Sequence, residues 1–179
     1  MKLTTYLFFL LLSFSSCGQK SLQEIVKESR IPKSELLILI DKSDYTLSVM
    51  HKEKKLITYP CVFGFDPVND KSREGDGCTP EGKFKIRSMY THISWSYFIW
   101  IDYPNTSSWE KFKRRKAEGK IPIDATIGGE VGIHGVPDGM DELIDQKSNW
   151  TLGCISLKEK DITDLYKSIG SSTMINIQP

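Results

Sequence analysis

The chain has 179 residues, of which 39% are hydrophobic and 26% charged, so the sequence predicts an ordinary globular domain and excludes whole-chain disorder. Its 24 Lys and Arg residues against 23 Asp and Glu residues give a formal net charge of +1. The chain therefore lacks the excess of positive charge typical of proteins that bind nucleic acid in bulk, and no nucleic-acid partner is expected. Function must therefore be sought in local chemistry.

Residues 1–16 are typical of a secretion signal. Lys2 is followed by an apolar run at 3–14, which is shorter than the roughly 20 residues of a membrane-spanning helix. Small residues then precede Cys17, an arrangement that resembles the lipobox of bacterial lipoproteins. The resemblance implies cleavage before Cys17, lipidation of its thiol and anchoring on a membrane surface. The alternative is an ordinary signal peptide with an unrelated cysteine.

The next segment, residues 17–34, is predicted to be a tether with a short helix at 21–30, where apolar residues recur at helical spacing. Residues 35–179 are expected to form the main domain. Its first half is rich in β-forming residues separated by polar turns. No alternation of strands and helices is visible, which argues against a doubly wound sheet. The predicted strands cover residues 35–41, 45–50, 56–63, 82–87 and 97–103.

The second half contains two predicted helices and a final strand. Residues 108–118 read as a helix with Ser108 as its N-cap. Before the last helix, Ser156 and Glu159 have the spacing of a capping box, and apolar residues mark one face from Ile162 onwards. Residues 172–177 close the chain as a strand. The sequence therefore predicts a mainly β fold with a few helices.

One histidine and one cysteine stand in similar glycine-flanked settings. His134 ends the probable strand that begins at Val131, and Cys154 follows 20 positions later, after Gly153. A thiol becomes a good nucleophile when a neighbouring imidazole or a helix N-terminus favours its deprotonation. The predicted helix start suggests a helix dipole acting on Cys154, and backbone amides near Gly153 would donate to an oxyanion. The alternative is a buried structural cysteine beside an unrelated histidine.

The other cysteines do not suggest a metal centre. No Cys-x-x-Cys or paired-histidine spacing is present, so no metal ligands and no zinc are predicted. The sequence leaves open whether Cys61 and Cys78 form a disulfide in an exported protein.

Several separated segments resemble one known family. Ile-His-Gly at 133–135, followed by Thr-Leu-Gly-Cys-Ile-Ser-Leu at 151–157, resembles the catalytic motif of the YkuD-type (ErfK/YbiS/YcfS/YnhG) L,D-transpeptidase domain. Residues 40–50, 75–84 and 101–105 resemble further landmarks of that domain in the same order. The resemblance covers roughly residues 36–177 and implies a β-sandwich or barrel.

The resemblance also implies a mechanism. Cys154 would be the nucleophile, His134 its general acid and base, and the Gly135 carbonyl would orient the imidazole. A peptidoglycan tetrapeptide stem would be attacked after its third residue, giving a thioester and releasing D-alanine. An amine acceptor would then complete a cross-link, and no cofactor would be needed. Gly153 and Thr151 would support the oxyanion and the His-Cys geometry.

Two departures from the family pattern leave the reaction open. Leu152 stands where the family often has His, and Ser156 stands where it often has Arg or Asn. The motif looks closest to the YafK-like branch, and the family includes hydrolytic members. The alternatives are therefore a cysteine hydrolase that trims stems or releases a wall-linked protein, and a wall-binding lipoprotein with an inactive site.

Aromatic residues are candidates for stem binding, and we expect Tyr59, Tyr103 and Trp150 to line a groove, although such residues more often belong to a core. The expected partners are peptidoglycan stems and a membrane reached through the lipid anchor. The expected location is an exported, membrane-anchored bacterial lipoprotein that faces the cell wall or periplasm.

Overall fold

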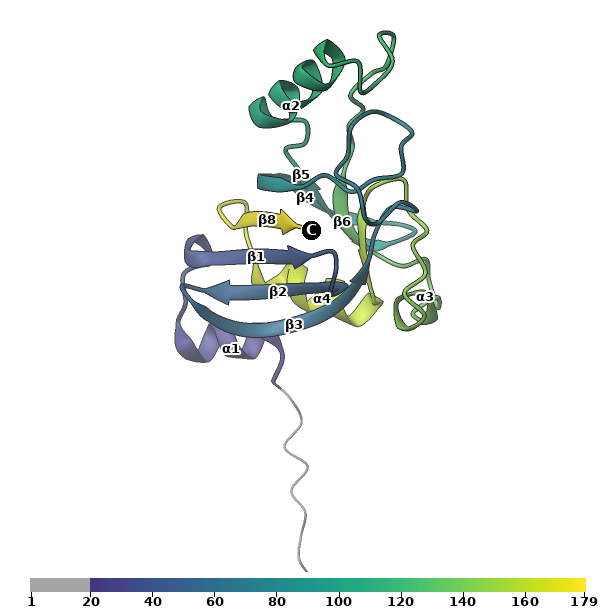
Figure 1. The fold of residues 1–179 in the computed structure, drawn as a ribbon. Helices are drawn as coiled ribbons and strands as arrows, with labels where there is room; N and C mark the ends of the chain where they lie inside the picture. The colour runs from purple at the N-terminus through teal and green to yellow at the C-terminus, as the bar shows by residue number, and fades with distance from the viewer. Residues whose placement is uncertain (1–19) are drawn as a thin grey trace, which may run out of the picture.

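The computed structural model describes residues 20–179, in which eight strands close into a barrel accompanied by four α-helices (Figure 1). The predicted signal segment 1–16 and Cys17 lie outside the described residues. The strands are β1 (Leu36–Asp41), β2 (Thr46–His51), β3 (Lys54–Val62), β4 (Gly82–His92), β5 (Ser96–Ile101), β6 (Gly132–Gly135), β7 (Ile155–Leu157) and β8 (Met174–Gln178). The helices are α1 (Leu22–Ser29), α2 (Thr106–Ala117), α3 (Glu142–Asp145) and α4 (Glu159–Ser168), with a short 3-10 turn at Lys33–Glu35. The mainly β prediction is confirmed.

The barrel order is β1-β2-β3-β7-β6-β5-β4-β8, with β8 returning to pair with β1. Two neighbouring pairs are parallel, namely β1 with β8 and β6 with β7, and the others are antiparallel. All five strands predicted in the first half of the chain are present, and β4 runs five residues beyond its predicted end. Closure leaves the barrel without a free sheet edge.

The core is built by period-two alternation along the strands. In β1, Leu36, Ile38 and Ile40 are buried while the residues between them are partly exposed. Apolar side chains of α4, including Ile162 and Leu165, join the same core cluster. Burial of these side chains is the main source of stability for the fold.

The segment preceding the barrel is part of the folded body. Helix α1 is the helix predicted at residues 21–30, and Ser21 caps it through a capping box with Glu24. Leu22 is fully buried, and the amides of Leu22 and Gln23 both donate to the carboxylate of Asp164 on α4. The short helix expected within the segment 17–34 is therefore present, and it packs against α4.

Two predicted helix caps are wrong. Helix α2 begins earlier than predicted, and the side chain of Asn105 caps it by accepting from the Ser108 amide. Helix α4 has Lys158 as its N-cap, because Ser156 belongs to β7 instead. A three-residue strand thus separates Cys154 from the helix start.

The longest described helix, α2, has 12 residues. Within residues 20–179, no helix has the length and apolar character of a segment that spans a bilayer.

Candidate active site

Neighbouring parallel strands bring His134 and Cys154 to one cavity. His134 lies in β6 directly opposite Ser156 in β7, and Cys154 stands two residues before Ser156. Paired residues face the same side of a sheet, so Ser156 and His134 do so, and Cys154 lies directly before β7. Both His134 and Cys154 line a cavity of about 600 Å³. The two residues singled out by their glycine-flanked settings therefore belong to one site.

The imidazole of His134 is held in one tautomer. Its Nδ1 lies 2.8 Å from the Gly135 carbonyl oxygen, which can only accept, so Nδ1 carries the proton. This leaves the Nε2 lone pair available as a base. Burial lowers the pKa of His134 to about 4, and the hydrogen bond to Gly135 only partly opposes this effect. The ring is thus neutral near pH 7, as a general base must be.

Aromatic rings fix the plane of this imidazole. Trp95 stacks on His134 with ring centroids 4.4 Å apart, and Phe98 lies nearly parallel to it at 5.7 Å. Trp150 meets the imidazole edge-on at 5.5 Å. The Trp95 carbonyl also accepts a hydrogen bond from the Gly135 amide. The turn between β4 and β5 therefore holds the histidine in place, and no motif in the sequence indicates this role for Trp95.

The thiol of Cys154 is half-buried and protonated at rest. Its Sγ donates to the Glu130 carbonyl oxygen at 3.6 Å. Burial raises the pKa of Cys154, whereas a backbone hydrogen bond from Gly132 and the charge of Lys71 lower it. Helix α4 begins beyond the far end of β7, so the helix dipole suggested by the sequence does not reach this thiol. Activation must therefore come from a base.

The turn before β7 is held by Thr151. Its hydroxyl donates to the Cys154 carbonyl at 2.7 Å and accepts from the Gly153 amide at 3.1 Å. Gly153 has φ +139°, and a Cβ at this position would lie 2.7 Å from the Cys78 carbonyl oxygen. Only glycine fits this conformation and this space. Because the Gly153 amide is already bonded within the turn, the Cys154 amide becomes the candidate oxyanion donor.

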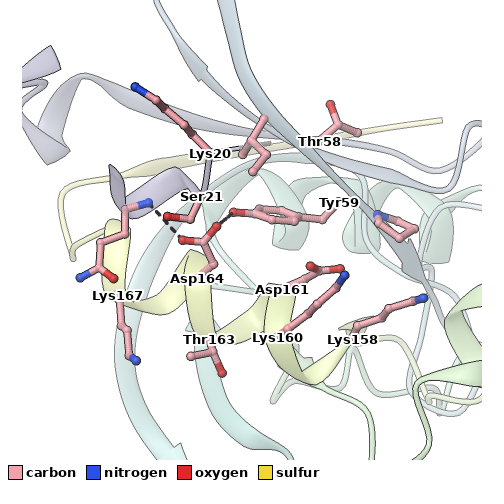
Figure 2. A pocket seen from close by; sticks show the side chains of 13 residues that line it. Lys20, Ser21, Thr58, Tyr59, Lys158, Lys160, Asp161, Thr163, Asp164 and Lys167 are labelled. Carbon is pink, nitrogen blue, oxygen red and sulfur yellow. Dashed lines mark hydrogen bonds between the residues drawn. The ribbon is translucent and has the colours of Figure 1, made fainter. Parts of the chain in front are cut away.

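Of the three aromatic residues proposed for stem binding, only Trp150 lines the cavity. Tyr59 faces a different pocket, between α1, β3 and α4, where its hydroxyl donates to Asp164 at 2.8 Å (Figure 2). Tyr103 is buried, and its hydroxyl donates to the Ile127 carbonyl. Tyr59 and Tyr103 therefore do not join Trp150 in this cavity, because both hydroxyls make internal contacts elsewhere.

The remaining cysteines are not reactive partners of this site. Cys61 and Cys78 are free and buried, so the disulfide left open by the sequence is not formed. Burial raises the pKa of Cys78 to about 12 and that of Cys61 further still. Within residues 20–179, no group of three or more His, Cys, Asp or Glu side chains is placed to hold a metal ion.

Cys154, directly before β7, and the neutral His134 in the adjacent strand β6 together form a candidate site for cysteine-dependent chemistry. Residues 35–177 match the model of the L,D-transpeptidase catalytic domain family, YkuD. This match covers most of the chain, and the chain belongs to that family.

Solved structures show the same fold. A match to Bd1075 from Bdellovibrio bacteriovorus has a TM-score of 0.56 at 22% identity, covering 80% of this chain and 48% of that one. The match to the helical cell shape determining protein Pgp2 from Campylobacter jejuni has a TM-score of 0.57 at 20% identity. It covers 88% of this chain and 55% of the Pgp2 chain. The match to L,D-transpeptidase 3 from Mycobacterium tuberculosis, in complex with a faropenem-derived adduct, has a TM-score of 0.54 at 12% identity. It covers 81% of this chain and 60% of that one.

The chain thus spans between about half and three fifths of the length of these solved chains. No curated protein sequence matches it. At these identities the solved structures support the fold alone.

Proposed function

We propose that this protein is a peptidoglycan L,D-transpeptidase in which Cys154 forms the acyl-enzyme. The observation that carries the proposal is the His134 imidazole, neutral and held by the Gly135 carbonyl, in the same cavity as Cys154. Membership of the L,D-transpeptidase catalytic domain family supports peptidoglycan stems as the substrate class.

In the first half-reaction, His134 Nε2 takes the Cys154 proton as Sγ attacks the carbonyl carbon of the third stem residue. The C–S bond forms, and the carbonyl oxygen becomes an oxyanion to which the Cys154 amide donates. The C–N bond then breaks, and the imidazolium gives its proton to the leaving amine. D-alanine leaves, and the stem remains on Cys154 as a thioester.

In the second half-reaction, an amine of another stem attacks the thioester and passes its proton to His134. The new C–N bond is the cross-link, and the thiol is restored. If water takes the place of the amine, the same residues give a trimmed stem or release a wall-linked protein. This hydrolytic reaction is the alternative function of the site.

The test is mass spectrometry of the full chain, purified in detergent and incubated with a disaccharide-tetrapeptide, beside Cys154→Ala. Loss of D-alanine with new cross-linked dimers, absent in Cys154→Ala, supports transpeptidation. Trimmed stems without dimers, even with a second amine supplied, favour the hydrolase. A complete absence of Cys154-dependent product contradicts both reactions and favours a wall-binding role.

We also propose that residues 1–16 are a cleaved signal, that Cys17 is lipidated and that residues 35–179 form the catalytic domain behind the segment 17–34. The protein would then face the cell wall or periplasm from a membrane. Metabolic labelling with a fatty acid tests this proposal, because the label should be lost in Cys17→Ala. Unchanged labelling in that variant would contradict lipidation at Cys17.

A further inference from the structure

The cavity around Cys154 contains one cation. Of the described residues that line it, Lys71 alone carries a positive charge, since His134 is neutral. The other ionisable groups on its wall, apart from the thiol, are the carboxylates of Glu74 and Glu130. A negatively charged group entering this cavity is therefore attracted to one point on its wall and repelled from two others.

Lys71 differs from the other buried lysine of the described chain in how its donors are used. The ammonium of Lys42 donates to the carbonyls of Val68 and Asn69 and to the carboxylate of Glu81, so all three of its protons have acceptors. The Lys71 side chain is only 4% exposed, yet its Nζ has one acceptor, Asp76 Oδ1 at 3.0 Å. Two buried donors of Lys71 are left for another partner.

The position of the Lys71 ammonium is fixed by Asp76. The Asp76 carboxylate also accepts from the amides of Ser72, Arg73 and Cys78 and from the Ser72 hydroxyl. These bonds lower the pKa of Asp76 and hold its charge in place. The carboxylate would keep four donors without Lys71, so the loop does not depend on this lysine for its hydrogen bonds.

The Lys71 ammonium also lies beside the turn at 151–154, which carries Cys154. Lys71 Nζ is 3.6 Å from the point that a Cβ of Gly153 would occupy, next to Cys154 in the chain. In a peptide whose scissile bond is followed by one residue, the terminal carboxylate carbon is three covalent bonds from the attacked carbonyl carbon, or at most about 4 Å. A stem attacked by Cys154 therefore carries its carboxylate into the neighbourhood of Gly153.

We propose that the Lys71 ammonium binds the free carboxylate of the residue that leaves the donor stem. Lys71 then restricts the enzyme to donors that end one residue beyond the scissile bond, because a longer stem places a neutral amide there. Two charge-assisted hydrogen bonds use the spare donors of Lys71 and anchor the leaving group while the carbonyl is attacked. This inference rests on the proposed acyl transfer at Cys154 and assigns a specificity role within it.

Binding to the full chain in detergent, carrying Cys154→Ala so that no ligand is consumed, tests the inference. Two tetrapeptide stems are titrated by calorimetry, one ending in a carboxylate and the other in a carboxamide. We expect the carboxylate to bind roughly 10- to 100-fold more tightly, the range of charged hydrogen bonds. With Lys71→Met added, both stems should bind with the weaker affinity. Lys113→Met on α2 is the matched control and should keep the preference.

Equal binding of the two stems to the chain with Lys71 intact overturns the inference, and so does a preference that survives in Lys71→Met. Failure of both stems to bind overturns it as well. The affinities of the two stems are first compared on the chain in which Lys71 is intact. A folding defect in Lys71→Met therefore cannot mask that result. Binding is measured on a chain that cannot turn over substrate, so these outcomes test Lys71 alone. A failure of the proposed reaction is seen separately, as missing product when Cys154 is intact.

Discussion

Two cavities of similar size lie at opposite ends of β7, and they differ in how their polar groups are used. The pocket at Tyr59 has a volume of about 530 Å³, and the cavity at Cys154 has about 600 Å³. In the first, Tyr59 donates a hydrogen bond to Asp164 (Figure 2). Asp164 also accepts hydrogen bonds from two backbone amides of α1. In the second, His134 Nε2 has no partner among residues 20–179, and Lys71 has one.

Volume therefore does not separate a reactive site from a structural one in this molecule. Hydrogen bonds in the Tyr59 pocket connect α1, β3 and α4. The cavity at Cys154 keeps buried donors and a buried base without partners, which costs stability unless a ligand fills them. Substitutions at the Cys154 cavity should thus change rates, with or without a change in stability, whereas substitutions in the Tyr59 pocket should change stability alone.

The largest effect is expected for His134→Gln. Because the Cys154 pKa is raised and the thiol is protonated at rest, losing the base should lower the rate of product formation by roughly 10²- to 10⁴-fold. Mass spectrometry of stem products at pH 7 measures the loss. His51→Gln is the matched control, since the His51 side chain hydrogen-bonds Glu35 and does not line this cavity. A rate within threefold of the unsubstituted chain would remove His134 from the mechanism.

The pH dependence of stability gives the next effect. The pKa of His134 is about 4 in the folded chain and about 6.5 in the unfolded chain. Between these values the unfolded chain binds a proton that the folded chain does not, so the free energy of unfolding falls as pH drops from 6.5 towards 4. The loss should be on the order of 3 kcal/mol by linkage, and it is absent at pH 7.

Denaturant unfolding at pH 7, 5.5 and 4.5 measures this loss, with His134→Gln as the reference that lacks the titrating ring. If the two chains lose the same stability on acidification, the burial of a neutral His134 is contradicted.

A smaller effect is expected for Thr151→Val. The substitution keeps the shape but leaves the Gly153 amide and the Cys154 carbonyl without their shared partner. Loss of these bonds should loosen the nucleophile's turn and reduce the rate roughly tenfold, with about 1–3 kcal/mol lost in stability. Thr151→Ser retains the hydroxyl and should restore both. Equal defects in the two variants would show that the methyl group matters more than the hydroxyl.

The smallest effect on rate is expected for Tyr59→Phe. This change removes one hydrogen bond to Asp164, which keeps the amides of Leu22 and Gln23. Unfolding should become easier by about 1 kcal/mol, and product formation should not change. A rate loss comparable to that of Thr151→Val would mean that the two cavities are coupled and that the comparison between them fails.

Much of the fold follows from local sequence patterns. Runs of β-branched and aromatic residues between polar turns predicted β1 to β5, and the apolar face from Ile162 predicted α4. The ends of helices and strands were harder to predict where a residue fits two elements. Ser156 fits a capping box by spacing, yet tertiary pairing with Val62 and His134 makes it a strand residue. The order of strands around the barrel depends on such long-range pairs and was not predicted.

The site was predictable only where it coincides with a contiguous motif. His134, Gly135, Thr151 and Cys154 lie in short glycine-flanked segments, so their chemistry is visible in the sequence. Lys71 lies far from Cys154 in the chain and outside the segments that resemble the family, and only the fold brings it to Gly153. Tyr59 and Tyr103 illustrate the opposite case, since aromatic character alone does not reveal whether a side chain faces a cavity or makes internal contacts.

Parallel pairing of β6 and β7 has a consequence for how this site can diversify. Strands that run in the same direction need a crossover, and here residues 136–154 form that connection, with α3 near its middle. The end of the crossover also carries Trp150, Thr151 and Leu152 on the cavity wall. Lengthening the segment between α3 and Trp150 would remodel the entrance without shifting the register of the two reactive strands. The shape of the cavity wall and the register that places His134 beside Cys154 can therefore change independently in this scaffold.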